Sequence, residues 1–231
     1  TESDPSEPGM NWRTYQIAAS HGTTIAGAED TLAGNLGPNI ADLSTSTDGW
    51  WMIDFVNMEQ GSLLDGTWTP GSAGHFTATA AAPQDVADQL IPGIPGGSND
   101  PKDNTDNIAA ECLTYLQLNP GIYDMVVNSD DGFEVTTGAN GALDEMKCLS
   151  LGSFDGGRGS SDTHFVIEVT NAGVYFFRLL WFEGGGGANV EWFSVDNVNG
   201  RSLVGGTQGG SIPAYKVRGA AEPQLTCGTG L

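Results

Sequence analysis

Two short segments of the chain carry side chains of the kind that bind a hard cation. The first contains Asn128 and the adjacent acids Asp130 and Asp131, and the second contains Glu183 and Asn189 on either side of a run of glycines. Calcium takes six to eight oxygen ligands at about 2.3–2.6 Å, from carboxylates, amide oxygens, backbone carbonyls and water. Adjacent carboxylates repel each other, and a shared cation offsets that repulsion. The pattern predicts a Ca²⁺ site with Asp130, Asp131, Glu183 and Asn189 as ligands.

Both carboxylates of an adjacent pair can face one ion only if the backbone departs from an ordinary extended strand, in which successive side chains point to opposite faces. We therefore expect a cis peptide bond between Asp130 and Asp131, a rare geometry outside proline that metal bonds can hold. The alternative is simpler, because Asp131-Gly132 alone is a hairpin-turn signal.

The glycine run, from 184 to 187, exposes backbone carbonyls and lets a ligand approach, so Gly185 and Gly186 are candidate ligand contacts. A flexible hairpin end is the alternative for this run. Trp181 and Trp192 border it, and their rings suit either stacking on the apolar face of a sugar or packing in the core. Asn128 and Arg158 complete the candidate ligand contacts.

The two segments end strands that start with similar turns. One strand starts at Asn119-Pro120-Gly121-Ile122-Tyr123 and the other at Asn171-Ala172-Gly173-Val174-Tyr175. From Tyr123 to Asp130 and from Tyr175 to Glu183 an extended strand spans about 23–26 Å, at roughly 3.3 Å per residue. If these strands run side by side, both oxygen-rich segments emerge at one edge of the sheet.

Composition favours an all-β fold, an antiparallel β-sandwich of jelly-roll type with long loops and extended terminal arms. The chain has 34 Gly and 11 Pro, and its apolar residues, 39% of the total, come in short bursts between turn residues. No stretch is long and apolar enough for a membrane helix. Phe165, Ile167 and Val169 are set against His164 and Glu168, and this alternation predicts one buried face and places His164 on the outer face.

The expected organisation is a single sandwich with additions. Residues 1–10 are an arm, residues 11–92 a β region of the same sandwich, residues 93–108 a loop, residues 109–218 the sandwich core and residues 219–231 a tail. Residues 74–79 are predicted as a strand and residues 85–90 as one helical turn before Pro92. The further strands are expected at 11–19, 50–56, 112–118, 122–128, 133–137, 163–170, 174–182, 190–195 and 214–217. Residues 96–107 look superficially like a calcium loop but lack the Glu and the helices of an EF-hand, so they are expected to be a solvated linker.

Charge and cysteine content limit the class of partner. Eight basic and 29 acidic residues give a net charge of −21, which disfavours nucleic acids and anionic membranes and suits divalent cations or simple solubility. The expected disulfide joins Cys112 and Cys148, on position alone, leaving Cys227 free or intermolecular. The chain opens at Thr1 without Met or an apolar leader, which is consistent with either a processed secreted protein or an excised fragment. We expect a secreted, extracellular or cell-surface location.

Residues 121–133 and 173–192 together resemble the protective-antigen-type β-sandwich module. This family includes yeast flocculin and epithelial-adhesin lectin domains and modules of bacterial glycosidases, and the resemblance covers about residues 109 to 217. In its lectin members it implies a Ca²⁺ ion held by an Asp-Asp pair with a cis peptide and by a second loop, with sugar hydroxyls on the ion. Asp130 and Asp131 match that pair, and Asn189 with the carbonyls of 184–187 matches the second loop approximately. The chain looks most like modules in large exported proteins of environmental bacteria.

The sequence lacks the motifs of serine hydrolases, zinc proteases and phosphate-binding loops, so we expect no enzyme activity. Any two carboxylates can meet about 5–9 Å apart in a fold, which leaves a glycosidase pair open. The first hypothesis is an extracellular, calcium-dependent carbohydrate-binding or adhesion module with a polysaccharide or glycan as partner. The second is a self-assembling extracellular subunit of a surface layer, stalk or filament, in which copies of the chain are the partners and Ca²⁺ only stabilises.

Overall fold

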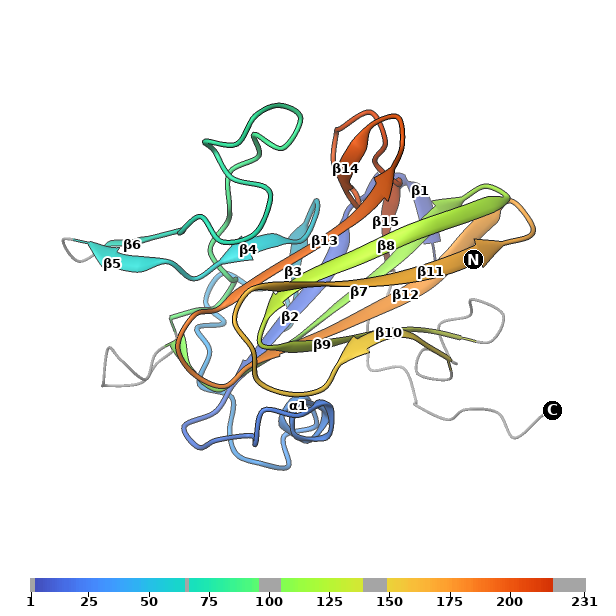
Figure 1. Cartoon of the computed structure of the whole chain (residues 1–231). Helices are drawn as coiled ribbons and strands as arrows, with labels where there is room; N and C mark the ends of the chain where they lie inside the picture. Colours follow the sequence, from blue (N-terminus) through green and yellow to red (C-terminus); the bar gives the residue numbers. More distant parts are fainter. Residues whose placement is uncertain (1–2, 65–66, 96–104, 139–148, 218–231) are drawn as a thin grey trace.

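Two antiparallel sheets face each other in the computed structural model, which describes residues 3–64, 67–95, 105–138 and 149–217 (Figure 1). The larger sheet has eight strands and the smaller has five, and a separate hairpin projects from the body. The expected all-β antiparallel sandwich is therefore confirmed.

The larger sheet has the order β1-β15-β7-β12-β9-β10, and β2 and β3 extend it beside β7. Its long central strand β7 pairs along its whole length with β12, while β2 and β15 share the opposite edge of β7. The strands of this sheet are β1 (Ser3–Pro8), β2 (Met10–Gln16), β3 (Trp51–Ile53), β7 (Ile108–Leu118), β9 (Gly132–Thr137), β10 (Leu149–Phe154), β12 (Gly173–Glu183) and β15 (Ala214–Val217).

The smaller sheet has the order β11-β8-β13-β14, with β4 beside β13. Its strands are β4 (Asn57–Glu59), β8 (Gly121–Asp130), β11 (Ser161–Val169), β13 (Asn189–Asp196) and β14 (Gly200–Leu203). The projecting hairpin consists of β5 (Ser62–Leu64) and β6 (Thr67–Thr69).

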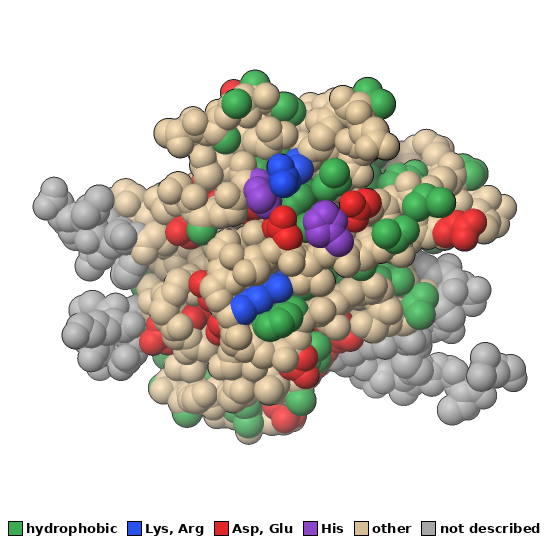
Figure 2. Space-filling model, in the orientation of Figure 1, with side chains coloured by type: hydrophobic (Ala, Val, Ile, Leu, Met, Phe, Trp, Pro, Cys, Tyr) green, Lys and Arg blue, Asp and Glu red, His purple; other side chains and the backbone are tan. Residues whose placement is uncertain are grey.

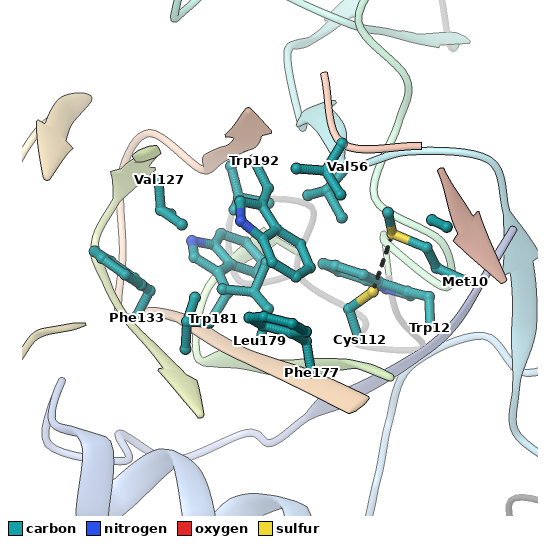
Figure 3. Packing of buried hydrophobic residues seen from close by; sticks show 14 of the residues in the cluster. Met10, Trp12, Val56, Cys112, Val127, Phe133, Phe177, Leu179, Trp181 and Trp192 are labelled. Atoms are coloured by element: carbon teal, nitrogen blue, oxygen red, sulfur yellow. Dashed lines mark hydrogen bonds between the residues drawn. The ribbon is translucent and has the colours of Figure 1, made fainter. Parts of the chain in front are cut away.

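The main hydrophobic core fills the space between the two sheets (Figure 3). The alternation along β11 is as predicted, because Phe165, Ile167 and Val169 are buried and the His164 side chain is 53% exposed. Trp12 of β2 packs 6.5 Å from Trp181 of β12, measured between ring centroids, and both rings are fully buried. Burial of such rings is a large part of the hydrophobic stabilisation of a sandwich.

One helix, α1 (Ile25–Leu32), covers part of the outer face of the larger sheet. Thr24 caps its N-terminus by accepting a hydrogen bond from the Gly27 N–H, and Ala28 and Leu32 pack against apolar side chains of β7 and β12. The helix was not predicted, although a Thr cap before an Ala-containing segment that ends near Gly34 is a recognisable signal.

A buried ion-pair network lies beneath this helix. The Arg178 guanidinium, on β12, is 2.6 Å from Glu111 on β7 and 2.8 Å from Glu29 on α1. Arg13 on β2 makes a second pair with Glu111 at 2.6 Å. The network joins the helix to three strands of the sheet.

Two predicted elements are wrong. Residues 74–79 form loop, because the backbone N–H groups of His75 and Phe76 bond to the Glu191 carboxylate instead of a neighbouring strand. Residues 85–90 form no helical turn; Glu59 and Gln89 are joined by a backbone hydrogen bond, which holds that segment in an extended form beside β4.

The expected arm and the region after it both enter the sheets. β1 pairs with β15 of the same chain, so the described part of the arm is used within the molecule. Residues 11–92 supply β2 and β3 to the larger sheet and β4 to the smaller. The expected linker and tail fall largely on residues 96–104 and 218–231, outside the described residues.

Cys112 has a free thiol, fully buried in the core, that donates to Met10 Sδ at 3.5 Å. Burial raises its pKa well above the usual range of a thiol. The expected disulfide between Cys112 and Cys148 is therefore wrong, because the Cys112 thiol is free inside the core. Cys148 and Cys227 themselves lie outside the described residues. Across the described part of the chain, no helix has the length and apolar character needed to cross a membrane.

Candidate functional site

The two oxygen-rich segments meet where the chain crosses between the sheets. β8 belongs to the smaller sheet and passes through Asp131 into β9 of the larger one, while β12 of the larger sheet passes through residues 184–188 into β13 of the smaller. Gly132 pairs with Phe182, and Asp130 pairs with Asn189. The loops therefore meet as expected, although β8 and β12 lie in opposite sheets and not side by side.

The peptide bond between Asp130 and Asp131 is cis, as expected. Asp131 is held on both sides, since its Oδ1 accepts from the Arg158 backbone N–H at 2.8 Å and its Oδ2 from the Gly184 N–H at 2.9 Å. Each carboxylate oxygen has a second lone pair. The Asp131 carboxylate is thus fixed in direction and still able to bind an ion.

Arg158 holds the Asp pair from the side of the β10–β11 loop. Its Nε donates to the backbone oxygens of Ser129 and Asp131 at 3.2 Å, and its Nη1 donates to Thr163 at 2.8 Å. The guanidinium also lies 4.2 Å from the centroid of the Phe154 ring. These contacts occupy the side chain, so Arg158 supports the loop and is not the free ligand contact that was expected.

Glu183 ends β12 with its side chain fully buried, and neither carboxylate oxygen has a hydrogen-bond partner of normal distance and angle among the described residues, although the Gly185 backbone N–H lies near enough to favour the charged form. Burial raises the pKa of Glu183 to about 9, and the charges of Asp131, Asp106 and Asp130 add to the effect, opposed by the backbone N–H of Gly185. A buried anion without a partner is costly. The Glu183 carboxylate therefore needs either a proton or a cation.

Asp130, the first residue of the Asp130–Asp131 pair, also has a raised pKa. Burial raises the pKa of Asp130 to about 7, and the charge of Asp131 and a hydrogen bond with its carboxyl group act in the same direction. Arg158 acts weakly in the opposite direction. The positive charge of Arg158 is thus insufficient to neutralise the carboxylates that approach each other here.

The glycine loop forms the open side of this site. Residues 185–187 are exposed, and Gly186 has a φ of +110°, which side-chain-bearing residues rarely adopt. A Cβ at Gly187 would lie 2.8 Å from Asp130 Oδ2, closer than real Cβ contacts allow. The missing side chains keep backbone carbonyls and the Asp130 carboxylate accessible from solvent.

Three residues that sequence reasoning missed also border the site. Asp106 lies beside the glycine loop, where a Cβ at Gly185 would be 3.5 Å from its Oδ2. His21 donates from Nε2 to the Glu183 carbonyl at 2.8 Å, and Thr23 packs against Gly184. Asp106 falls in the segment 96–107, for which the sequence predicts a solvated linker, whereas no local spacing signals His21 or Thr23, which come from a distant part of the chain.

Asn189 and Asn128 are buried rather than available to a surface ligand. Asn189 is 1% exposed and donates from Nδ2 to Asn128 Oδ1 at 2.9 Å, while its own Oδ1 is buried and accepts from no described residue. Asn128 is 4% exposed. Of the two, Asn189 has the spare oxygen that a cation could use.

Trp181 and Trp192 do not form a stacking surface. Both side chains are 0% exposed, and they lie in the core between the sheets (Figure 3). The Trp181 Nε1 donates to the Asp130 carbonyl at 3.1 Å, so this ring supports the site from within. The expectation that the two rings contact a sugar is wrong, since alternation along β12 and β13 turns them inward.

Within the described residues, no three Asp, Glu, His or Cys side chains are grouped so that they alone could hold a metal ion. A cation at this junction would need backbone carbonyls of the glycine loop and the Asn189 oxygen beside the carboxylates. Calcium accepts such mixed oxygen sets, because its coordination is flexible in number and angle. The donor set fits Ca²⁺ better than it fits zinc, which prefers nitrogen and sulfur ligands.

The raised pKa values predict how stability depends on pH. The folded state holds protons on Asp130 up to about pH 7 and on Glu183 up to about pH 9, whereas the unfolded chain releases them at about 3.8 and 4.5. The metal-free protein is therefore expected to lose stability as the pH rises through this window. A calcium ion at this junction would bind the deprotonated form, so the increase in melting temperature produced by added Ca²⁺ should be larger at pH 8 than at pH 5.

Differential scanning calorimetry at the two pH values, with Ca²⁺ and with EDTA, measures this difference. Burial also raises the pKa of Glu191 to about 8, which contributes to the metal-free trend without contributing to the calcium effect. A calcium-induced shift in melting temperature that is equal or smaller at pH 8 would contradict the assignment of Asp130 and Glu183 to the site.

No family model and no curated protein matches this sequence. Solved structures do match its fold. The PA14 domain of the MpAFP antifreeze protein is 14% identical with a TM-score of 0.52, over 90% of this chain and 91% of that one. The A domain of epithelial adhesin 9 from Candida glabrata, in complex with Galb1-3GlcNAc, is 10% identical with a TM-score of 0.53, over 96% of both chains. The chain therefore has a β-sandwich fold of the kind found in PA14 and epithelial-adhesin domains.

Proposed function

We propose that this chain is a calcium-dependent glycan-binding module that acts in adhesion or targeting outside the cell. The observation that carries the proposal is the junction of the two inter-sheet loops. There the cis Asp130–Asp131 pair, the unpaired buried carboxylate of Glu183 and an exposed glycine loop converge.

The residues that would hold the ion are Asp130, Asp131, Glu183 and Asn189, with carbonyl oxygens of residues 185–187. Bound calcium would neutralise the carboxylates and offer open coordination positions to hydroxyl groups. The protein's own contribution is to hold the ligands rigidly. Arg158 and Gly184 fix the Asp131 carboxylate, and the Trp181 Nε1 holds the Asp130 carbonyl.

The glycan part of the proposal is supported by the fold and by the exposed face of the loop. A protein of similar fold was solved with a disaccharide bound, Galb1-3GlcNAc. Residues 185–187 are exposed and have no side chains, which leaves the ion side of the loop open to a flat ligand. Because Trp181 and Trp192 are buried, affinity would come from hydroxyl contacts to the ion and not from stacking on these rings.

A glycan panel tests the proposal. Isothermal titration calorimetry with neutral mono- and oligosaccharides, including Galb1-3GlcNAc, should show heat of binding for at least one glycan in 5 mM Ca²⁺ (roughly a saturating level for an extracellular site) and none in EDTA. The Asp131→Asn variant is the matched control and should show none in either buffer. Binding that persists unchanged in EDTA, or no binding to any glycan, would contradict the proposal.

A further inference from the structure

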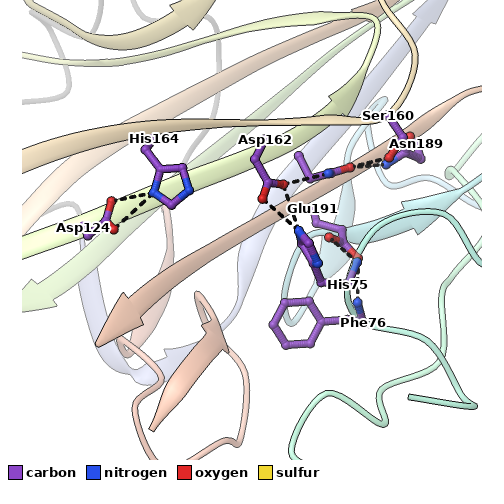
Figure 4. A network of polar contacts seen from close by, with 9 residues as sticks. His75, Phe76, Asp124, Ser160, Asp162, His164, Asn189 and Glu191 are labelled. Carbon is purple, nitrogen blue, oxygen red and sulfur yellow. Dashed lines mark hydrogen bonds and ion pairs between the residues drawn. The ribbon is translucent and has the colours of Figure 1, made fainter. Parts of the chain in front are cut away.

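A chain of polar side chains crosses the outer face of the smaller sheet and ends at Asn189 (Figure 4). The His75 Nε2 donates to the Asp162 carboxylate at 2.9 Å. Asn128 donates from Nδ2 to Asp162 Oδ1 at 2.8 Å, and Asn189 donates to Asn128 Oδ1 at 2.9 Å. Ser160 adds a hydrogen bond to the same Asn128 oxygen at 2.7 Å. The chain is continuous from the surface imidazole to the buried amide.

Asp162 determines which group donates and which accepts in each hydrogen bond of this polar network. Burial tends to raise the pKa of Asp162, but hydrogen bonds from Asn128 and His75 and the charges of His75 and Arg201 outweigh burial and lower it. The ionised carboxylate can only accept hydrogen bonds. Asn128 must therefore turn its NH₂ group toward Asp162, which leaves its oxygen facing Asn189.

The orientation of the Asn128 amide in turn fixes the orientation of the Asn189 amide. Its NH₂ group must face the Asn128 oxygen, so its own oxygen faces the other way. Asn128 precedes Asp130 by two residues on β8 and lies further from the loops. Asn189 is directly opposite Asp130, and a Cβ at Gly187 would be 2.8 Å from Asp130 Oδ2. An oxygen turned away from Asn128 therefore lies on the side of the glycine loop.

Both asparagine side chains are buried, so the orientation of their amide groups affects whether their polar atoms find partners. Asn128 and Asn189 are 4% and 1% exposed, so water cannot easily replace a lost partner. The Asn189 oxygen is buried and has no hydrogen-bond partner among the described residues. A buried amide oxygen without a donor is costly, and a cation beside Asp130 would satisfy it.

We propose that Asp162 is a positioning residue for the loop junction: acting through Asn128, it fixes the Asn189 amide with its oxygen toward the glycine loop. The part of this inference that concerns ion affinity rests on the proposed calcium site. The orientation of the two amides does not, because it follows from the hydrogen bonds alone.

The test replaces Asp162 by alanine and follows the side-chain amide groups of Asn128 and Asn189 by ¹H–¹⁵N NMR without metal. The matched control is Asp124→Ala. Asp124 is a more exposed carboxylate on the same sheet face, paired with His164 at 3.0 Å and with no hydrogen bond to either asparagine (Figure 4). The acidic and histidine side chains of this face lie close together at the surface (Figure 2).

In Asp162→Ala, the Asn189 side-chain amide protons should exchange with solvent at least about tenfold faster, in keeping with the loss of a hydrogen bond to a charged group. Calcium affinity should fall by a similar factor, and Asp124→Ala should change neither. If the alanine variant does not fold, Asp162→Asn, which keeps an acceptor oxygen but loses the charge, should show the same change to a smaller extent.

Unchanged Asn189 amide exchange in a folded Asp162 variant would overturn the inference. A wild-type protein that binds no calcium but shows the exchange effect would refute the proposed function and leave the positioning role of Asp162 supported. Altered exchange of the Asn189 amide with unchanged calcium affinity would overturn the link between the hydrogen bonds from Asp162 to Asn189 and the ion.

Discussion

Replacing Asp131 by asparagine should weaken calcium binding by about 100-fold, equivalent to about 2.7 kcal/mol. Asp131 is the best-held carboxylate of the junction, since the Arg158 and Gly184 backbone N–H groups each hold one of its oxygens. Asparagine keeps the shape of the side chain but loses the charge. It also turns an NH₂ group toward one of these two N–H donors, so that contact becomes repulsive.

Calcium titration by calorimetry measures this change in affinity. Asp124→Asn is the control, because Asp124 is an acid on β8, the strand that leads to Asp131, and its hydrogen bond goes to His164 and not to the loops. The control should retain wild-type affinity. Equal affinities for the Asp131 variant and the wild-type protein would show that calcium binds elsewhere or that this carboxylate is not a ligand.

Replacing Arg178 by methionine should lower the free energy of unfolding by about 3 kcal/mol, the lower end of the cost of breaking a buried ion pair, because Arg13 still pairs with Glu111. The Arg178 side chain is 1% exposed and neutralises Glu111, whose side chain is 5% exposed, and Glu29 on α1. Methionine fills much of the same volume without positive charge. Arg13 continues to pair with Glu111, but it does not replace the ion pair that Arg178 makes with Glu29 on the helix.

Urea unfolding followed by tryptophan fluorescence measures this change. Lys216→Met is the matched control, because Lys216 pairs with Glu7 at the surface, where the two side chains are 30% and 46% exposed. Surface ion pairs contribute about 0–1 kcal/mol. A loss below about 1 kcal/mol for Arg178→Met would mean that this network does little to hold α1 and the sheet together.

The sequence predicted the loop junction because the relevant signals are local. Adjacent acids are hard to accommodate in an extended strand, which made a cis bond at Asp130 and Asp131 the natural expectation, and the structure has it. Similar distances from matching turns also predicted that the loops meet. That reasoning assumed neighbouring strands, whereas β8 and β12 lie in opposite sheets and the loops meet as two connections that cross between the sheets in opposite directions.

Other features depend on contacts between distant segments, which spacing does not encode. Asp106, His21 and Thr23 reach the junction only because β2, β7 and the segment before α1 pack beside it. Alternation shows that a residue such as Trp192 faces one side of its strand. It does not show whether that side is core or solvent, and for Trp181 and Trp192 it is core.

The segment 74–79 failed as a strand for a related reason. Phe76 is apolar and alternates with polar neighbours, which favours a strand. Its side chain is fully buried against Phe193 on the outer face of the smaller sheet, and its N–H donates to the Glu191 carboxylate at 2.8 Å. Side-chain acceptors here replace the backbone partners that a strand would need.

The most direct test of the calcium site is anomalous diffraction from crystals grown with Ca²⁺, collected at a wavelength where calcium scatters anomalously. A peak is expected beside Asp130 and Asp131, within ligand distance of Glu183 or Asn189 and of the glycine-loop carbonyls, about 2.3–2.6 Å from the nearest oxygens. The absence of any peak at the junction in calcium-containing crystals would contradict the central claim.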